Sequence, residues 1–147
     1  NIKLAMTLDP DSEEIIALHD KIEPKASEVR ANKEFRRGQG EESMGRQEEA
    51  LAAYLRAIEA NPDDTRSLTK AAALMLELDC ELRDAVNFCR RVKEIDSDNS
   101  QILLTLAKIY NKLGMYKNAV RELNTYVSAN PLDERATEML KELKKKQ

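Results

Sequence analysis

The sequence predicts an all-α protein built from repeated pairs of helices. Apolar residues recur at the three- and four-residue spacing of helices that bury one face. The pattern repeats every 34 or 35 residues, since Ala50, Ala85 and Ala119 occupy equivalent places. Charged residues make up 35% of the chain and aromatic residues only 4%, a composition typical of exposed helices rather than of a β-sandwich. The 147 residues suffice for one short array with a real core.

Residues 45–62 carry the repeated element most clearly. One apolar stripe runs along this stretch, formed by Ala50, Leu51, Tyr54, Ala57 and Ile58. Gly45 precedes the stripe, and Pro62 ends it because the residue before a proline is pushed out of the helical conformation. The same two residue types return 69 positions later as Gly114 and Pro131. We therefore expect a second helix in each unit, bounded by a glycine turn and a proline.

The N-terminal 30 residues do not fit the period and are expected to hold extra helices. Residues 1–8 have the apolar spacing of a helix end that Pro10 would stop. The helix that follows is expected to end or kink at Pro24, and another to begin near Lys25. Residues 1–30 are therefore predicted to be the end of a preceding repeat plus an inserted helix. The chain begins without methionine, and we expect it to be part of a longer protein.

Three units are predicted to follow, at 31–64, 65–99 and 100–133, each made of two helices joined by a turn. In the second unit, the turn Asp79–Glu81 replaces the glycine and holds one extra residue. The first unit fits least well, because Arg37 and Glu41 are charged where the third unit is apolar. We expect its first helix to pack loosely at its end or against the inserted helix. Residues 134–147 are predicted to form a capping helix with one charged face.

These features resemble the tetratricopeptide repeat, whose units hold two helices and recur every 34 residues. The small residues at the two helix crossings of each unit are Gly38, Ala72 and Ala107, then Ala50, Ala85 and Ala119. Asp79, in place of the turn glycine, and Ser97, in place of the proline, depart from the pattern. The resemblance implies a right-handed α-α superhelix whose concave face is lined by the first helix of each unit.

A weaker resemblance concerns the segment from Pro24 to Gly38 and the turn Leu-Asp-Cys-Glu-Leu-Arg-Asp-Ala. Both are similar to the repeat tails of some bacterial proteins that carry a J-domain or a related signalling module. Neither stretch contains a pattern of residues with chemical function. This resemblance implies a targeting or regulatory segment of a larger J-domain co-chaperone or signalling enzyme.

No pattern predicts catalytic residues, a cofactor or a metal site. His19 is the only histidine, which excludes two-histidine zinc sites and histidine-based triads within the chain. The segment Gly38-Gln39-Gly40 lacks the later glycine and lysine of a phosphate-binding loop. Cys80 and Cys89 are not a Cys-x-x-Cys pair. We expect both thiols to be reduced, as is usual in the cytoplasm, and therefore predict a cytoplasmic protein. We therefore predict that the protein is not an enzyme.

Charge and hydropathy bear on the partners. The net charge is −3, from 24 basic and 27 acidic side chains, whereas proteins that bind duplex nucleic acid usually carry a cationic excess. No run approaches the 18 apolar residues of a membrane span. We expect a protein or peptide partner, and nothing in the pattern indicates a homo-oligomer.

The expected binding surface is the concave face. Of the 18 side chains predicted to point inward, five are basic and two acidic. The peptide-binding residues predicted there are Asn32, Arg36, Gln39, Arg66, Thr69, Lys70, Gln101, Thr105, Lys108, Asn111 and Lys112. Such amides and cations suit an extended acidic peptide held through its backbone and carboxylates. Any solvated helix face would carry a similar mixture, so both interpretations stay open.

The resemblance also allows one ligand class to be tested. Family members that hold the C-terminal carboxylates of heat-shock chaperones use lysine, asparagine and arginine at five positions. Here these positions hold Phe35, Gln39, Lys70, Gln101 and Thr105. Only Lys70 among them is basic, so the sequence predicts a non-catalytic interaction scaffold without that clamp. The alternatives are the regulatory segment described above and a self-association module that uses the inserted helices.

Overall fold

The computed structural model of the chain describes residues 13–147, with side chains described from residue 26 onward. The helices are α2 (Glu13–Ser43), α3 (Gln47–Ala60), α4 (Thr65–Leu78), α5 (Leu82–Ile95), α6 (Ser100–Lys112), α7 (Tyr116–Ala129) and α8 (Glu134–Lys146). No strand occurs between residues 13 and 147, and the predicted all-α fold is confirmed. The helix end expected at residues 1–8 lies outside the described residues.

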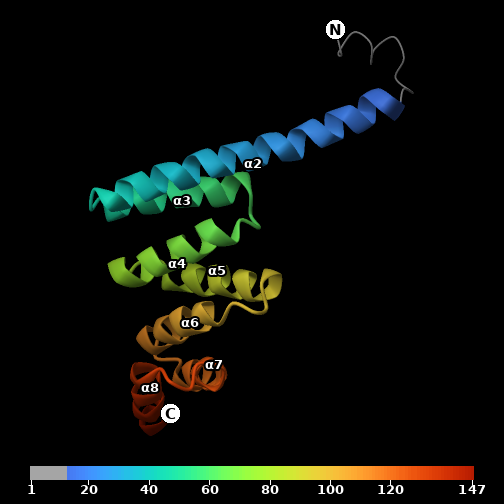
Figure 1. Cartoon of the computed structure of the whole chain (residues 1–147). Coiled ribbons are helices and arrows are strands. Elements are labelled where there is room, and N and C mark those ends of the chain that lie inside the picture. The colour runs from blue at the N-terminus through green and yellow to red at the C-terminus, as the bar shows by residue number, and fades with distance from the viewer. Residues whose placement is uncertain (1–12) are drawn as a thin grey trace.

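The helices stack in chain order. α2 packs on α3, α4 on α5 and α6 on α7, and each pair contacts the next through α3–α4, α5–α6 and α7–α8. Figure 1 shows the array running from α2 at one end to α8 at the other, with the helix axes turning along the stack. α4 also contacts α6, which brings the first helices of two successive pairs together. This is the helical-repeat architecture that the sequence predicts.

The N-terminal helix differs from the prediction. α2 continues from Glu13 through Pro24 to Ser43. Of the two predicted outcomes at Pro24, a helix end or a kink, the end is therefore wrong, as is the restart near Lys25, and the kink stays a prediction. An internal proline removes one backbone hydrogen bond, and it can bend a helix without ending it. Figure 1 shows the first part of α2 reaching beyond α3. In the described part of the chain, the extra residues therefore lengthen the first helix of the first pair.

The turns between paired helices follow the glycine pattern where glycine is present. Gly45 and Gly114 both have a φ of +75°, which glycine adopts without strain. Between α4 and α5, the left-handed positions are taken by Asp79 and Glu81, with φ of 54° and 49°. The departure from the pattern is thus a turn in which two non-glycine residues adopt an unfavourable conformation.

Small residues lie where the helices cross. Ala50, Ala85 and Ala119 are fully buried, as are Ala72 and Ala107. Gly38, at the corresponding place on α2, is buried against the ring of Tyr54. Because a larger side chain at any of these places would separate the helices, the burial supports the packing argument drawn from the repeat.

Aromatic side chains hold the first pair together. Phe35 on α2 and Tyr54 on α3 are buried, with ring centroids 5.6 Å apart. Arg37 is exposed and Glu41 is half-buried, so the charged residues of this unit lie outside that contact. Met44, after the end of α2, is 67% exposed, in agreement with loose packing at that end. Among the helices of residues 13–147, α2 packs on α3.

α8 ends the described array. Ala136, Leu140 and Leu143 are buried on it, and it packs on α7. The Asp133 carboxylate accepts hydrogen bonds from the Tyr126 hydroxyl at 2.7 Å and from the Ala136 N–H at 3.1 Å. These two hydrogen bonds lower the pKa of Asp133 and fix the start of the helix. The role of α8 as a cap, like the unit boundaries, stays a prediction.

Candidate functional site

The first-helix face, the surface of α2, α4 and α6 that carries the predicted peptide-binding residues, holds a shallow pocket. The pocket has a volume of about 330 Å³ and lies between α2 and α4, beside the start of α6. Its lining residues are Phe35, Thr65, Arg66, Thr69, Lys70 and Asn99. Arg66, Thr69 and Lys70 belong to the predicted binding set, and Phe35 to the predicted inward positions. The structure brings these four side chains together.

Arg66 is held in this pocket by three neighbours. Its Cζ lies 4.5 Å from the centre of the Phe35 ring, and its Nη2 donates to Asn32 Oδ1 at 2.5 Å. Its Nε donates to Asp64 Oδ1 at 3.1 Å, and Asp64 is buried. The charge of Arg66 is therefore compensated inside the protein. The guanidinium offers a ligand a fixed stacking surface rather than an unpaired cation.

Lys70 lines the same pocket and faces a carboxylate. Its Nζ lies 3.7 Å from Glu42 Oε1, and the Tyr54 hydroxyl donates to the same oxygen. Burial and the hydrogen bond to Glu42 raise the pKa of Tyr54, so the hydroxyl stays protonated and keeps this bond. The Lys70 side chain is 46% exposed. Because an exposed ion pair contributes only about 0–1 kcal/mol, Lys70 can exchange Glu42 for a ligand carboxylate.

The other three predicted cations differ in their partners. Lys112 Nζ donates to the Leu76 carbonyl at 3.3 Å and lies 3.9 Å from Asp79 Oδ1. Arg36 and Lys108 are exposed, and no carboxylate within residues 26–147 lies within 4.0 Å of them. Lys112, Lys70 and Arg66 all have carboxylate partners. The first-helix face is therefore less cationic than the count of residues indicates.

The remaining predicted residues supply polar groups. Thr69 Oγ1 donates to the Thr65 carbonyl at 2.7 Å, so the methyl group of Thr69 remains available for other contacts. The last four predicted residues are exposed or half-buried and do not line the pocket; they are Gln39, Gln101, Thr105 and Asn111. The pocket thus gathers side chains mainly from α2 and α4, and the predicted residues of α6 lie beyond it.

Two lining residues were missed in the sequence, Thr65 and Asn99. Thr65 is the first residue of α4, and Asn99 caps α6 by accepting a hydrogen bond from the Ile102 N–H at 3.3 Å. Both residues lie at the connections between the predicted units, outside the first-helix positions that the sequence analysis considered for binding. Counting positions along the first helices cannot find residues of the connections between units.

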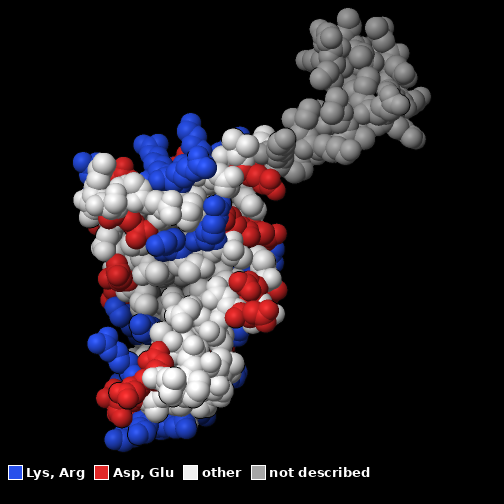
Figure 2. All heavy atoms as spheres, in the orientation of Figure 1, with Lys and Arg blue, Asp and Glu red and all other residues white. Residues whose placement is uncertain are grey.

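The surface charge is mixed. Figure 2 shows acidic side chains along the edge where the α3–α4 and α5–α6 connections lie, and basic side chains over α2 and at the end of the array that holds α8. The electrostatic fields of neighbouring patches of opposite sign partly cancel at a distance, and salt screens what remains of them. Recognition on this molecule must therefore depend on individual side chains and pockets more than on a single long-range field.

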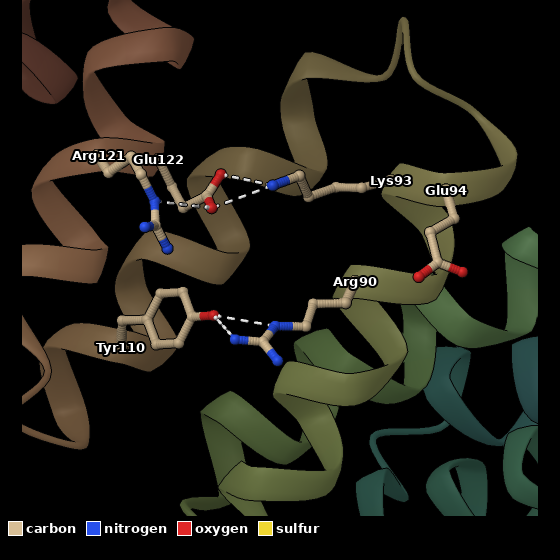
Figure 3. A pocket seen from close by; sticks show the side chains of 6 residues that line it. All are labelled: Arg90, Lys93, Glu94, Tyr110, Arg121 and Glu122. Atoms are coloured by element: carbon tan, nitrogen blue, oxygen red, sulfur yellow. Dashed lines mark hydrogen bonds and ion pairs between the residues drawn. The ribbon is translucent and has the colours of Figure 1, made fainter.

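A larger pocket, here called the second-helix pocket, lies between α5 and α7. It has a volume of about 470 Å³ and is lined by Arg90, Lys93, Glu94, Tyr110, Arg121 and Glu122. Figure 3 shows five of these side chains lying together from α5, α6 and α7, with Glu94 apart from them at the edge. None of them was predicted, because the family resemblance directs attention to the first helices. The available signal was Glu122, a carboxylate three residues after the buried Ala119 and thus on the packed face.

The described residues contain neither a group of metal ligands nor a membrane-spanning helix. Among the side chains described, those of residues 26–147, no three His, Cys, Asp or Glu are grouped so that they could hold a metal ion. No helix in residues 13–147 is long and apolar enough to cross a membrane.

Burial raises the pKa of the Cys89 thiol to about 12, and the Glu122 charge adds to this shift. A thiol of this kind is an inert part of the core.

Comparison with known proteins gives a family. Residues 35–64 and 80–143 match family models described as tetratricopeptide repeat. The chain is 23% identical over 155 residues to DnaJ homolog subfamily C member 3 of Gallus gallus, with 99% of this chain and 30% of that protein covered. The chain thus spans less than a third of the length of this curated relative.

Solved structures share the same architecture. The Arabidopsis OM64 TPR domain superposes with a TM-score of 0.73 at 23% identity, covering 81% of this chain and 98% of that domain. The first TPR of Spaghetti, bound to the HSP90 peptide SRMEEVD, gives a TM-score of 0.72 at 16% identity, covering 80% and 93% of the two chains. At these identities the likeness establishes the fold.

Proposed function

Because the chain belongs to the tetratricopeptide repeat family, we propose that it is a non-catalytic module that binds an extended segment of a partner protein across the first-helix face. The observation that carries the proposal is the pocket between α2 and α4, which combines the Phe35 ring with Arg66 and Lys70. The bound acidic peptide in the Spaghetti domain supports a ligand of the same general kind.

The pocket favours a segment with an apolar side chain next to a carboxylate. The Arg66 guanidinium, stacked on the buried Phe35 ring, offers a flat surface for an apolar group. Lys70 lies beside them and can pair with a carboxylate. Arg36 and Lys108, which have no carboxylate partner within residues 26–147, extend the positive contacts on either side. Hydroxyl and amide groups of Thr65 and Asn99 suit the backbone of an extended peptide.

Charge reversal on the first-helix face tests this proposal. Lys70→Glu with Lys108→Glu should weaken partner binding, while Lys144→Glu with Lys145→Glu makes the same change of charge on α8. Two exposed ion pairs contribute about 1 kcal/mol together, which corresponds to about a fivefold loss of affinity. The measurement is recovery of partners from a lysate, followed by fluorescence anisotropy with labelled acidic segments of a recovered partner that carry an apolar residue next to a carboxylate. Equal binding by wild type and both variants would exclude this face as the site.

A second candidate function is a segment of a longer J-domain protein. The similarity to DnaJ homolog subfamily C member 3 extends over 99% of this chain, which favours this candidate over a signalling enzyme. The interaction site would then deliver a bound protein to the chaperone machinery of the parent protein. The sequence of the parent on both sides of residues 1–147 is the test, and a parent without a J-domain would exclude the idea. A cytoplasmic location stays a prediction under either function.

A further inference from the structure

The second-helix pocket collects positive charge that the protein does not compensate. Lys93 Nζ donates to both carboxylate oxygens of Glu122 at 3.0 Å. Glu122 is only 6% exposed, and a buried carboxylate requires such a partner. Lys93 and Glu122 therefore form a closed pair whose charges cancel. Glu94, at the pocket rim, lies 3.3 Å from Arg91 Nη1, and Arg91 is not a lining residue.

One guanidinium group of the pocket, that of Arg90, has no carboxylate partner within residues 26–147, and that of Arg121 has only a long contact with the Glu122 carboxylate. Arg90 donates through Nε and Nη2 to the Tyr110 hydroxyl at 3.2 and 3.0 Å. No carboxylate lies within 4.0 Å of Arg90 in the described part of the chain. Arg121 Nε is 3.9 Å from Glu122 Oε1, beyond hydrogen-bond distance, and that carboxylate is already shared with Lys93. Arg90 and Arg121 thus bring two positive charges to one pocket.

The hydrogen-bonding groups of the pocket are also unsaturated. A guanidinium carries five N–H donors, and Arg90 directs only part of its set to Tyr110. The Tyr110 oxygen accepts from Arg90, so its own proton remains available for an acceptor in the pocket. Figure 3 shows Arg121 and Arg90 reaching toward Tyr110 from two sides. Because Tyr110 is 1% exposed, it holds Arg90 in one position and reduces the ordering cost of binding.

We propose that the second-helix pocket is a separate binding site for an oxyanion, the carboxylate or phosphate group of a partner molecule. Planar guanidinium forks match the oxygens of both groups, and the Tyr110 hydroxyl supplies a further donor. The lining contains three cations and two carboxylates, so a single negative charge would bring it to neutrality. The charged residues of the site lie on α5 and α7 and its Tyr110 on α6, and none of its lining residues belongs to the binding surface proposed above, so the two sites can be tested independently.

Anion titration followed by NMR of the arginine Nε–H groups tests this site. Sodium phosphate and sodium acetate are added separately to the protein, with sodium chloride at matched ionic strength as the reference. The Arg90 and Arg121 signals should shift saturably with at least one oxyanion and not with chloride. Stronger binding of phosphate would identify a phosphorylated ligand, and stronger binding of acetate would identify a carboxylate ligand.

Variants decide whether the shifts report this pocket. Binding by the variants is followed through the backbone N–H signals of Lys93 and Glu122, which line the pocket and are kept in every variant. Arg90→Gln with Arg121→Gln should weaken oxyanion binding by about tenfold or more, since charge-assisted hydrogen bonds from two groups are lost. Both side chains are exposed, so the fold should persist, which circular dichroism can verify. Arg83→Gln, an exposed arginine of α5 outside the pocket, is the matched control. Equal shifts in chloride, unchanged binding by the double variant, or an equal loss in the control would overturn the proposal.

Discussion

Gly38 should be the most size-restricted position on α2. A Cβ atom added to Gly38 would lie 2.5 Å from Tyr54 Cε1 and 2.7 Å from Cδ1, whereas non-bonded carbon atoms normally approach to about 3.5–4.0 Å. Tyr54 has no exposed surface, and its hydroxyl is bonded to Glu42. The ring therefore has little room to move. Gly38→Ala must push α2 away from α3, although alanine is the better helix former.

Gly40 allows the cost to be isolated. It lies in the same helix, is exposed, and has nothing within 4 Å of an added Cβ. Both alanine substitutions gain the same helix propensity, about 0.5–1 kcal/mol, but only Gly38→Ala overpacks the contact with Tyr54. The difference in unfolding free energy between the two variants should therefore equal the overpacking cost, about 1–3 kcal/mol.

Urea denaturation followed by circular dichroism gives this difference directly. Gly40→Ala should be more stable than wild type, and Gly38→Ala should be less stable than Gly40→Ala. Adding Tyr54→Leu to Gly38→Ala should cost less than the sum of the two single changes, because both act on one contact. If Gly38→Ala is as stable as Gly40→Ala, the close approach of α2 to α3 at this glycine is not what selects a small residue there.

Two further predictions concern the turns and the cysteines. Glu81→Gly should stabilise the chain by about 1 kcal/mol because Glu81 has a positive φ, while Gly114→Ala should destabilise it by a similar amount; urea denaturation measures both, and a gain in stability for Gly114→Ala would contradict the argument. A thiol reagent at about pH 8 should modify the half-buried Cys80 and spare Cys89, whose thiol is buried and has a pKa raised to about 12. Mass spectrometry should find one adduct on the native chain and two on the denatured chain, and equal labelling of both native thiols would refute this reasoning.

The repeat could be predicted from the sequence because helix crossings restrict residue size. Ala50, Ala85 and Ala119 are fully buried. The need for a small side chain at each of these positions depends only on its immediate neighbours. The course of the N-terminal helix could not be predicted in the same way. Pro24 weakens a helix locally, but whether the helix ends there depends on the segments on both sides. The local rule therefore placed a break in the middle of the continuous α2.

The candidate site was predictable in its positions and not in its charge. The helical period placed Arg66 and Lys70 on one face, where they line a pocket with Phe35. Their carboxylate partners are Asp64, from the preceding connection, and Glu42, from another helix. The Lys70–Glu42 pair forms only when the units stack, and Asp64 lies outside the first-helix positions although it is two residues from Arg66. A count of charges along the first helices therefore overestimates the free charge.

This compensation changes what salt should do to binding on the first-helix face. Exposed charges are screened beyond about 8 Å at physiological ionic strength, so contributions from Arg36 and Lys108 should fall first as salt is added. The stacked surface of Phe35 and Arg66 depends on contact area, and its contribution is much less sensitive to salt. The affinity that remains at high salt is therefore the part that reports the pocket. A ligand that loses all affinity at high salt would be held by the exposed cations alone.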